Sequence, residues 1–196
     1  MTPPPVAACK ARAGGAGPPP ADASGGGVTI LGIDPGLNAT GYGIIDVAPE
    51  ERVRVLAAGA VKPSARQPLA RRLHDLYDTL TRIVDAHHPQ LMVLESLFTH
   101  HAYVTTAALM GHARGVACLV GAEHDMRVVE YLPKRVKKAV TGNGAASKEQ
   151  VARAVGMWLG LETSSWASDV TDALALAIAH AQMSRSRGRI LAGAVG

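Results

Sequence analysis

Aromatic residues, cysteine and long apolar runs are all scarce in this chain of 196 residues. It has one Phe, two Trp and four Tyr, so its core must consist of aliphatic side chains, for which a hydrophobic content of 47% is ample. Two cysteines are too few for a disulfide scaffold and fit a reducing compartment. No apolar run reaches the roughly 18 residues of a membrane span, and the N-terminus lacks the continuous apolar segment of a signal peptide. We therefore expect a cytoplasmic protein without membrane segments.

The two ends of the chain differ in composition from the part between them. Residues 1–27 are rich in Pro, Gly and Ala and have few large apolar side chains to offset the entropy cost of ordering, so we expect a disordered N-terminal extension. Residues 28–184 carry the regular apolar patterns of one folded domain. Residues 185–196 are expected to form a flexible basic tail. The net charge of +4 is compatible with nucleic-acid binding without proving it.

The spacing of apolar residues predicts a mixed α/β fold. Strands are expected at 28–34, 41–48 and 53–61, joined as an antiparallel meander, and again at 91–95 and 126–131. Helices are expected at about 69–84, 102–123, from Pro133, from a capping box at Ser147 to Trp158, and at 167–183. Together these elements predict a five-stranded mixed sheet with helices on both faces.

Two of the predicted strands end in a carboxylate. The apolar run 28–33 is followed by Asp34, and the run 91–94 is followed by Glu95. An acid at the end of a buried strand lies at the rim of the sheet, where its carboxylate reaches a ligand. The alternative for Asp34 is an ordinary Asp-Pro-Gly turn, because these residue types dominate turns for backbone reasons alone. If the ligand is a nucleic acid, with which the net charge is compatible, the glycines beside Asp34 are expected to leave room for its backbone.

A second pair of acids is expected on one face of the last helix. Asp169 and Asp172 are three residues apart, so their side chains share one side of that helix. Acids in a first turn are also stabilised by the helix dipole without any ligand. Against this alternative, Asp172 leads into the apolar run 173–179, which is typical of a helix buried against a sheet. We therefore expect four carboxylates to cluster at the rim of the sheet, namely Asp34, Glu95, Asp169 and Asp172.

A cluster of four carboxylates requires cations. Without them, each close pair repels by roughly 4 kcal/mol at about 4 Å when the effective dielectric constant is about 20. Donor sets made only of oxygen favour Mg²⁺ or Mn²⁺. Two such ions about 4 Å apart activate a water and stabilise the leaving oxygen of a phosphodiester. The acids therefore predict metal-dependent phosphodiester hydrolysis.

Motifs along the whole predicted domain carry a resemblance to a known family. Ile30-Leu-Gly-Ile-Asp-Pro-Gly36 with Thr40-Gly-Tyr-Gly43 resembles the opening strand of the RuvC family of Holliday-junction resolvases. The likeness ends at Asp169-Val-Thr-Asp-Ala-Leu-Ala175, and between these motifs it includes 93–95, Phe98, 111–115, 136–137, 140–144 and Lys148. It covers residues 28–184 in order, so it is specific where any single motif would be weak.

The resemblance implies an RNase H-like fold and a homodimer that cuts four-way DNA junctions symmetrically, in cooperation with the branch-migration proteins RuvA and RuvB. It implies Mg²⁺ as the cofactor, with Mn²⁺ as a substitute and two ions per site. Asp34, Glu95, Asp169 and Asp172 match the family's catalytic, metal-binding acids. Lys137 and Lys148 match basic residues that serve the DNA backbone near the site, and Phe98 matches an aromatic residue that stacks on bases at the crossover.

The residues themselves are consistent with these DNA contacts. Phe98 falls in a polar stretch after a strand end, where base stacking competes with a role as a lid over the sheet edge. After Phe98 the chain departs from the family pattern at 99–101, so the sequence preference of cleavage and any DNA contact of His100 or His101 stay open. A basic helix face borders the proposed site, which favours phosphate contact over an ordinary solvated face. This face carries Lys134, Arg135, Lys137 and Lys138.

The segment 102–123 is unusually rich in Ala and Gly for a helix. Small residues permit the close approach of another helix, and a protein with two-fold symmetry presents two identical sites to the two strands that a junction resolvase must cut. We expect this helix to contribute to a dimer interface. The alternative is that its small residues only pack on the sheet of the same chain.

Three other functions compete with a junction resolvase. An actin-like or sugar-kinase ATPase uses a similar strand–Asp–x–Gly turn, but it needs a second nucleotide-binding lobe, for which residues 28–184 are too few. A non-catalytic junction-binding protein would gain nothing from clustered negative charge. A relaxed structure-specific nuclease of the same fold is compatible with the sequence.

Overall fold

The structure is a computed structural model that describes residues 27–48, 52–96, 104–163 and 165–193. The elements follow in the order β1 (Val28–Asp34), β2 (Thr40–Val47), β3 (Val53–Val61), α1 (Leu69–His87), β4 (Leu91–Glu95), α2 (Val104–Glu123), β5 (Arg127–Tyr131), α3 (Pro133–Thr141), α4 (Lys148–Leu159) and α5 (Ser168–Gly193). The strands begin and end within about one residue of their predicted bounds. The extension expected to be disordered, 1–27, lies outside the described residues except for Gly27.

The strands form one five-stranded mixed sheet in the order β3-β2-β1-β4-β5, as predicted. β1 pairs antiparallel with β2, and β2 with β3, whereas β1 with β4 and β4 with β5 run parallel. Because β1 and β4 are parallel neighbours, their carboxyl ends lie at the same edge of the sheet. Their register pairs Ile33 with Leu94, so Asp34 and Glu95 occupy the next positions on the two strands.

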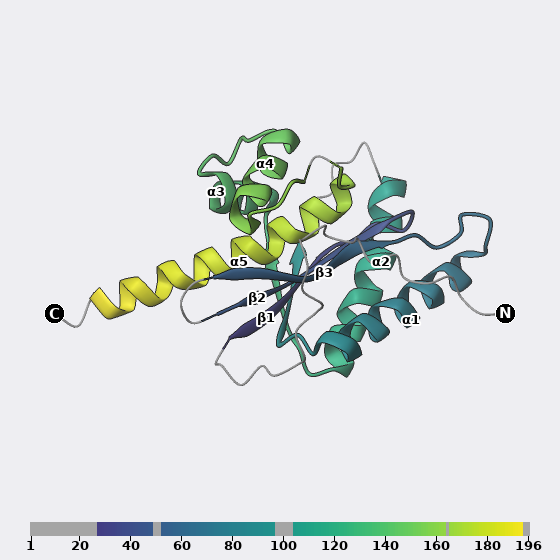
Figure 1. Cartoon of the computed structure of the whole chain (residues 1–196). Coiled ribbons are helices and arrows are strands. Elements are labelled where there is room, and N and C mark those ends of the chain that lie inside the picture. The colour runs from purple at the N-terminus through teal and green to yellow at the C-terminus, as the bar shows by residue number, and fades with distance from the viewer. Residues whose placement is uncertain (1–26, 49–51, 97–103, 164, 194–196) are drawn as a thin grey trace, which may run out of the picture.

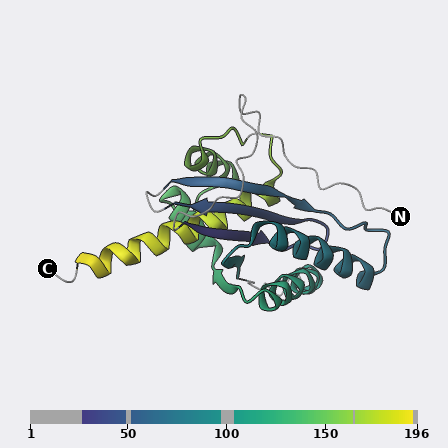
Figure 2. The same ribbon diagram turned by 60° about the horizontal axis from the view of Figure 1, so that its bottom comes forward.

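Helices cover both faces of this sheet, as predicted (Figures 1 and 2). α1 and α2 lie on one face, where they pack against Leu31, Ile33 and Leu94. α3, α4 and α5 lie on the other face, where Ile30 and Val93 join the core. Successive residues of a strand point to opposite faces, so each central strand supplies both cores. Both cores are mainly aliphatic, in agreement with the low aromatic content.

Local signals explain several helix ends. Ser147 caps α4 through the predicted capping box, in which its side chain accepts from the Gln150 N–H and the Gln150 side chain accepts from the Ser147 N–H. Pro133 stands in the first turn of α3, where its missing N–H costs nothing. α3 ends at Thr141 and is capped by Gly142, whose φ of 79° is a left-handed conformation that suits glycine. These ends set the lengths of α3 and α4, both of which pack against α5.

The last helix is longer than the sequence predicted. α5 continues to Gly193, past the expected helix end at Met183. The flexibility expected of residues 185–196 stays a prediction. Residues 184–192 contain no proline, and the single Gly188 costs only about 1 kcal/mol relative to alanine, too little to end a helix already formed. The C-terminal part of α5 projects beyond the sheet (Figure 1). Within the described part of the chain, no helix combines the length and apolar character needed to span a bilayer.

Candidate active site

The alternation of side chains along β1 and β4 puts Asp34 and Glu95 on the same face of the sheet. Asp34 lies two residues after Gly32, and Glu95 lies two residues after Val93, so each acid points to the same face as that residue. Gly32 and Val93 both face the side on which α5 packs. The two strand-end acids therefore converge at the carboxyl edge of neighbouring strands, beneath α5.

Glycines on β1 and β2 let the backbone of α5 lie against the sheet. A Cβ at Gly32 would lie 2.0 Å from the carbonyl oxygen of Ala173, and a Cβ at Gly41 would lie 1.9 Å from that of Asp169. Because Gly41 pairs with Asp34 across β1 and β2, this contact brings the start of α5 beside Asp34.

The expectation that glycines beside Asp34 leave room for a DNA backbone is therefore corrected. At Gly32 and Gly41 the space belongs to α5. At Gly36 a Cβ would lie 2.5 Å from the carbonyl oxygen of Ala39, within the turn itself. The protein's own backbone occupies the space at all three positions.

The four predicted acids interact electrostatically in the folded chain. Burial raises the pKa of Asp34 to about 7, and repulsion from Asp172, Glu95 and Asp169 adds to the rise, in that order of size. The pKa of Glu95 is also raised, first by burial and then by Asp172. The structure thus brings together the acids that the sequence placed at two strand ends and on one helix face.

Two lysines lie beside these acids, one on α3 and one on α4. The Nζ atom of Lys148 donates a hydrogen bond to Asp172 Oδ2 at 3.3 Å. The charge of Asp172 raises the pKa of Lys148, with smaller contributions from Asp34 and Asp169. Lys137 and Lys148 both lower the pKa of Glu95. These two cations offset part of the repulsion, and Lys148 remains 70% exposed to a ligand.

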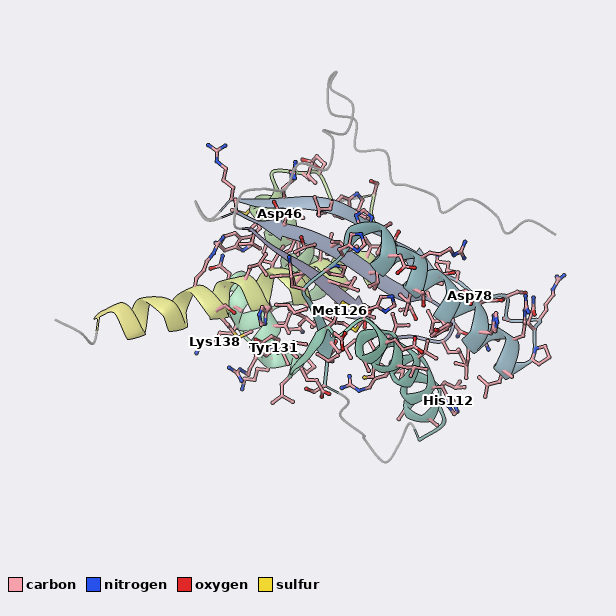
Figure 3. The ribbon with its side chains drawn as sticks, turned by 90° about the horizontal axis from the view of Figure 1, so that it is seen from below. Asp46, Asp78, His112, Met126, Tyr131 and Lys138 are labelled. Carbon is pink, nitrogen blue, oxygen red and sulfur yellow. The ribbon has the colours of Figure 1, made fainter. Side chains whose placement is uncertain are left out.

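The other predicted basic residues of α3 lie on its exposed side. Lys134 and Lys138 are exposed, and Lys138 is labelled in Figure 3. Arg135 lies over the Tyr131 ring, 5.6 Å from its centroid, and donates to the sulfur of Met183 at 3.9 Å. Met183 is about three turns along α5 from the acids, so Arg135 is held away from them.

Several predicted DNA contacts cannot be placed. Phe98, His100 and His101 lie outside the described residues, which end at Ser96 and resume at Val104. The stacking role of Phe98 therefore stays a prediction, as does any contact of the two histidines.

The chemistry of the four acids fits a hard divalent ion, because they supply only oxygen ligands. Within the described ranges, no three acidic, histidine or cysteine side chains gather closely enough to ligate one ion together. The fit therefore rests on the donor set and on the repulsion that raises the pKa of Asp34. A cation bound between the carboxylates would relieve this repulsion.

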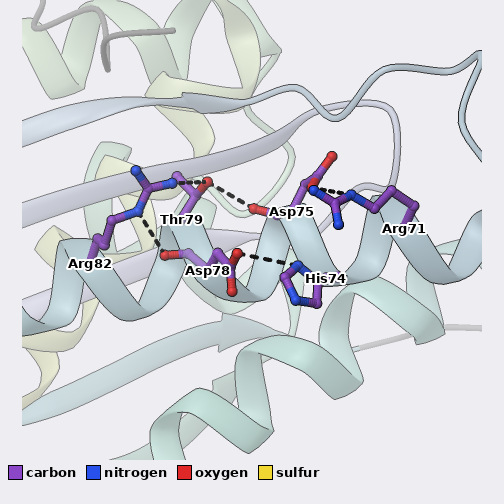
Figure 4. Close-up of polar contacts among 6 residues, drawn as sticks. All are labelled: Arg71, His74, Asp75, Asp78, Thr79 and Arg82. Atoms are coloured by element: carbon purple, nitrogen blue, oxygen red, sulfur yellow. Dashed lines mark hydrogen bonds and ion pairs between the residues drawn. The ribbon is translucent and has the colours of Figure 1, made fainter. Parts of the chain in front are cut away.

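Asp75 and Asp78 of α1 do not form a comparable cluster, because each pairs with a basic residue of its own helix (Figure 4). Asp75 pairs with Arg71 and Asp78 with His74, each at 3.2 Å and four residues apart. Such ladders satisfy exposed charges along a helix and need no ligand.

Sequence reasoning missed two arginines that hold the backbone near the acids. Arg72 on α1 donates to the carbonyl oxygen of Leu37 at 3.0 Å and to Asn38 Oδ1 at 2.9 Å, in the turn that follows Asp34. Arg114 on α2 donates to the carbonyl oxygen of Glu95 at 2.7 Å. The available signal for Arg72 was its position four residues before the buried Leu76, on the inward side of the helix. Arg114 lies in the segment 111–115 of the quoted motif, but nothing assigned it a role.

Comparison with known proteins identifies the family. Residues 30–180 match the family model described as crossover junction endodeoxyribonuclease RuvC. The chain is 44% identical over 149 residues to the protein of that name from Rhodopirellula baltica, which covers 76% of this chain and 83% of the relative. It is 40% identical over 152 residues to the one from Alkaliphilus metalliredigens, which covers 78% of this chain and 92% of the relative.

Solved structures of Holliday junction resolvases resemble this chain as well. Thermus thermophilus RuvC in complex with a Holliday junction substrate superposes with a TM-score of 0.76 at 31% identity, covering 81% of this chain and 96% of that one. The yeast mitochondrial Holliday junction resolvase Ydc2, at 12% identity and a TM-score of 0.56, shares the fold. The fold is thus that of an RNase H-like nuclease. The chain belongs to the RuvC family of crossover junction endodeoxyribonucleases, a family of metal-dependent nucleases.

Burial of Asp34 and the charges of its acidic neighbours predict that the protein in EDTA loses stability as pH rises. A raised pKa means that the folded state favours the protonated acid. Its contribution is complete below the unfolded-state pKa of 3.8 and is lost as pH rises through about 7. We expect Asp34→Asn to increase the free energy of unfolding at pH 8 by on the order of 2 kcal/mol, and to change it little near pH 4.

Urea unfolding of both proteins at the two pH values measures this difference. Asp46→Asn is the matched control. Asp46 lies on the same sheet, but its carboxylate is 3.9 Å from the cation of Arg54 instead of among other acids. An effect of Asp34→Asn that is equal at pH 4 and pH 8 would contradict the assignment.

Proposed function

We propose that this chain resolves four-way DNA junctions by hydrolysing one phosphodiester bond in each of two strands, with Asp34, Glu95, Asp169 and Asp172 as the catalytic acids. The observation that carries this proposal is their convergence at the carboxyl edge of β1 and β4, in a chain of the RuvC family. The Thermus relative, solved with a Holliday junction substrate, supports junction DNA as the partner.

The four acids would hold two Mg²⁺ ions, for which Mn²⁺ can substitute. Mg²⁺ keeps several waters and takes one or two protein carboxylates with substrate phosphate, so four carboxylates suffice for a pair of ions. Bound ions supply a water of lowered pKa and stabilise charge on the leaving oxygen. The carboxylates themselves fix where the ions lie relative to the scissile phosphate.

The cations on α3 and α4 would contact the phosphates. Lys148 is exposed and 3.3 Å from Asp172, and Lys137 is close enough to lower the pKa of Glu95, so both suit phosphates at the site. Lys134, Arg135 and Lys138 line the exposed side of α3 and would contact a more distant part of a junction arm. We assign stacking at the crossover to Phe98.

The exposed face of α2 is our proposed dimer interface. Ala108, His112, Gly115 and Leu119 recur at helical spacing and are exposed, and Leu119 is 52% exposed despite its apolar side chain. Among the described residues, a Cβ at Gly111 or Gly115 would meet no atom within 4 Å outside the neighbouring backbone of its own helix. Figure 3 shows His112 on the outer side of α2, away from the strands. A two-fold dimer through this face would present two sites to the two strands.

Family membership is also the basis for proposing cooperation with the branch-migration proteins RuvA and RuvB, and for placing the protein with cellular DNA in the cytoplasm. Purified RuvA and RuvB added to a junction cleavage reaction would show whether they alter its rate.

The cleavage reaction tests the proposed function directly. We expect paired, symmetric nicks in a labelled four-way junction with Mg²⁺ or Mn²⁺, none in EDTA, and none in a linear duplex. Asp34→Asn should slow cleavage at least about 100-fold, because a metal ligand is lost, while junction binding in a gel-shift assay persists. Asp46→Asn, outside the cluster, should cleave normally.

Cleavage that survives in EDTA or in Asp34→Asn would refute the proposed mechanism. Equal cleavage of the junction and the linear duplex would instead identify a relaxed nuclease.

The dimer proposal predicts that Gly111→Leu dissociates the protein. A Cβ at Gly111 meets no described atom within 4 Å beyond its own helix backbone, so the substitution should leave the fold intact while it separates two helices that pack closely. Analytical ultracentrifugation should show at least a tenfold weaker dimer, beside an unchanged circular dichroism spectrum. Ala70→Leu, an exposed substitution on α1, is the control. A Gly111→Leu protein as fully dimeric as the wild type would exclude this interface.

A further inference from the structure

Two hydrogen bonds hold the backbone where β4 ends at Glu95. The N–H of Ser96 donates to the carbonyl oxygen of Tyr131 on β5 at 2.9 Å. The carbonyl oxygen of Glu95 accepts from Nη1 of Arg114 at 2.7 Å. These two bonds hold the carboxyl end of β4 to β5 and to α2.

Arg114 connects three elements at this point. It belongs to α2, it bonds to the end of β4, and its Nη2 pairs with the carboxylate of Glu130 on β5. The sheet register pairs Glu130 with Leu94, the neighbour of Glu95. The planar guanidinium presents two donors in a fixed geometry, which suits one contact to each strand.

The burial of Arg114 indicates that it joins α2 to β4 and β5 and is not a solvated surface charge. The side chain of Arg114 is 13% exposed, whereas that of Glu130 is 49% exposed. A surface ion pair would contribute little, but the bond from a mostly buried guanidinium to a backbone carbonyl is charge-assisted and directional. Arg114 therefore fixes the position of the Glu95 backbone.

We propose that Arg114 is a positioning residue for Glu95, which sets the direction of the Glu95 carboxylate towards the metal site it shares with Asp34 and Asp172. This inference rests on the proposed function, in which Glu95 is a metal ligand. Arg114 lies on α2, the helix of the proposed dimer interface. Its hydrogen bond to the Glu95 carbonyl oxygen therefore links this helix to a proposed catalytic acid.

Direct contact with a DNA phosphate is the competing role for an arginine beside a nuclease site. Both terminal nitrogens of Arg114 already have acceptors in the chain, and little of the side chain is exposed. The two roles predict different measurements. Loss of a phosphate contact weakens junction binding and reduces its salt dependence, whereas loss of a positioning contact leaves junction binding unchanged and alters metal binding.

The test compares Arg114→Gln with the wild type in Mn²⁺ affinity, measured by titration calorimetry without DNA, and in single-turnover junction cleavage. We expect about tenfold weaker Mn²⁺ binding and cleavage slower by about 10- to 100-fold, since small misplacements of a reacting group cost that much. Junction affinity should stay within about twofold. Glu130→Gln, which keeps the bond to Glu95 but loses the ion pair, should give a smaller effect in the same direction.

A matched control and a double mutant separate positioning from general damage. Arg127→Gln removes the same charge from an exposed site at the start of β5 and should change nothing. In a Glu95→Gln background, Arg114→Gln should have no further effect on Mn²⁺ affinity, because the residue acts through Glu95.

Full additivity of the two substitutions would overturn the inference, and so would weaker junction binding with unaltered Mn²⁺ affinity. If the wild type binds Mn²⁺ and cleaves junctions while Arg114→Gln matches it in both, the positioning role alone fails. A wild type that binds no Mn²⁺ would overturn the proposed function, and this inference with it.

Discussion

The approach of the α5 backbone to β1 and β2 is the contact on which the site depends. Only a hydrogen atom fits where the carbonyl oxygens of Ala173 and Asp169 meet Gly32 and Gly41. The first turns of α5 thereby lie over the ends of the central strands, and the charges of Asp169 and Asp172 reach Asp34. A larger residue at either glycine would lift the helix and its two acids away from the sheet, without changing any acid itself.

This packing creates an electrostatic conflict inside the fold. It removes solvent from Asp34 and adds Asp169 and Asp172 to the neighbouring Glu95 of β4, so the pKa of Asp34 rises to about 7. Lys148 on α4 and Lys137 on α3 offset part of the repulsion between the acids. A cluster that opposes folding when it is ionised is characteristic of a functional site, where local stability is given up for ligand binding. A bound cation would relieve this repulsion, which agrees with the metal dependence of the family.

The parts of the fold that the sequence predicted have local causes. Apolar runs that stop at Asp34 and Glu95 marked strand ends, and the capping box at Ser147 marked the start of α4. What the sequence missed depends on partners far away in the chain. The glycines of β1 and β2 meet a helix that begins more than 120 residues later, and Arg114 bonds to a backbone carbonyl, which has no signature in the sequence. The individual roles of the acids came from the family resemblance, because spacing alone predicted only a cluster.

Anomalous diffraction from crystals grown with Mn²⁺ would test most directly whether these four carboxylates form one metal site. We expect Mn²⁺ peaks bonded to the side-chain oxygens of Asp34 and of its neighbours on β4 and α5, and loss of those peaks in Asp34→Asn. Mn²⁺ found only elsewhere on the protein, or bound unchanged in Asp34→Asn, would contradict a metal site built from strand ends and a closely packed helix.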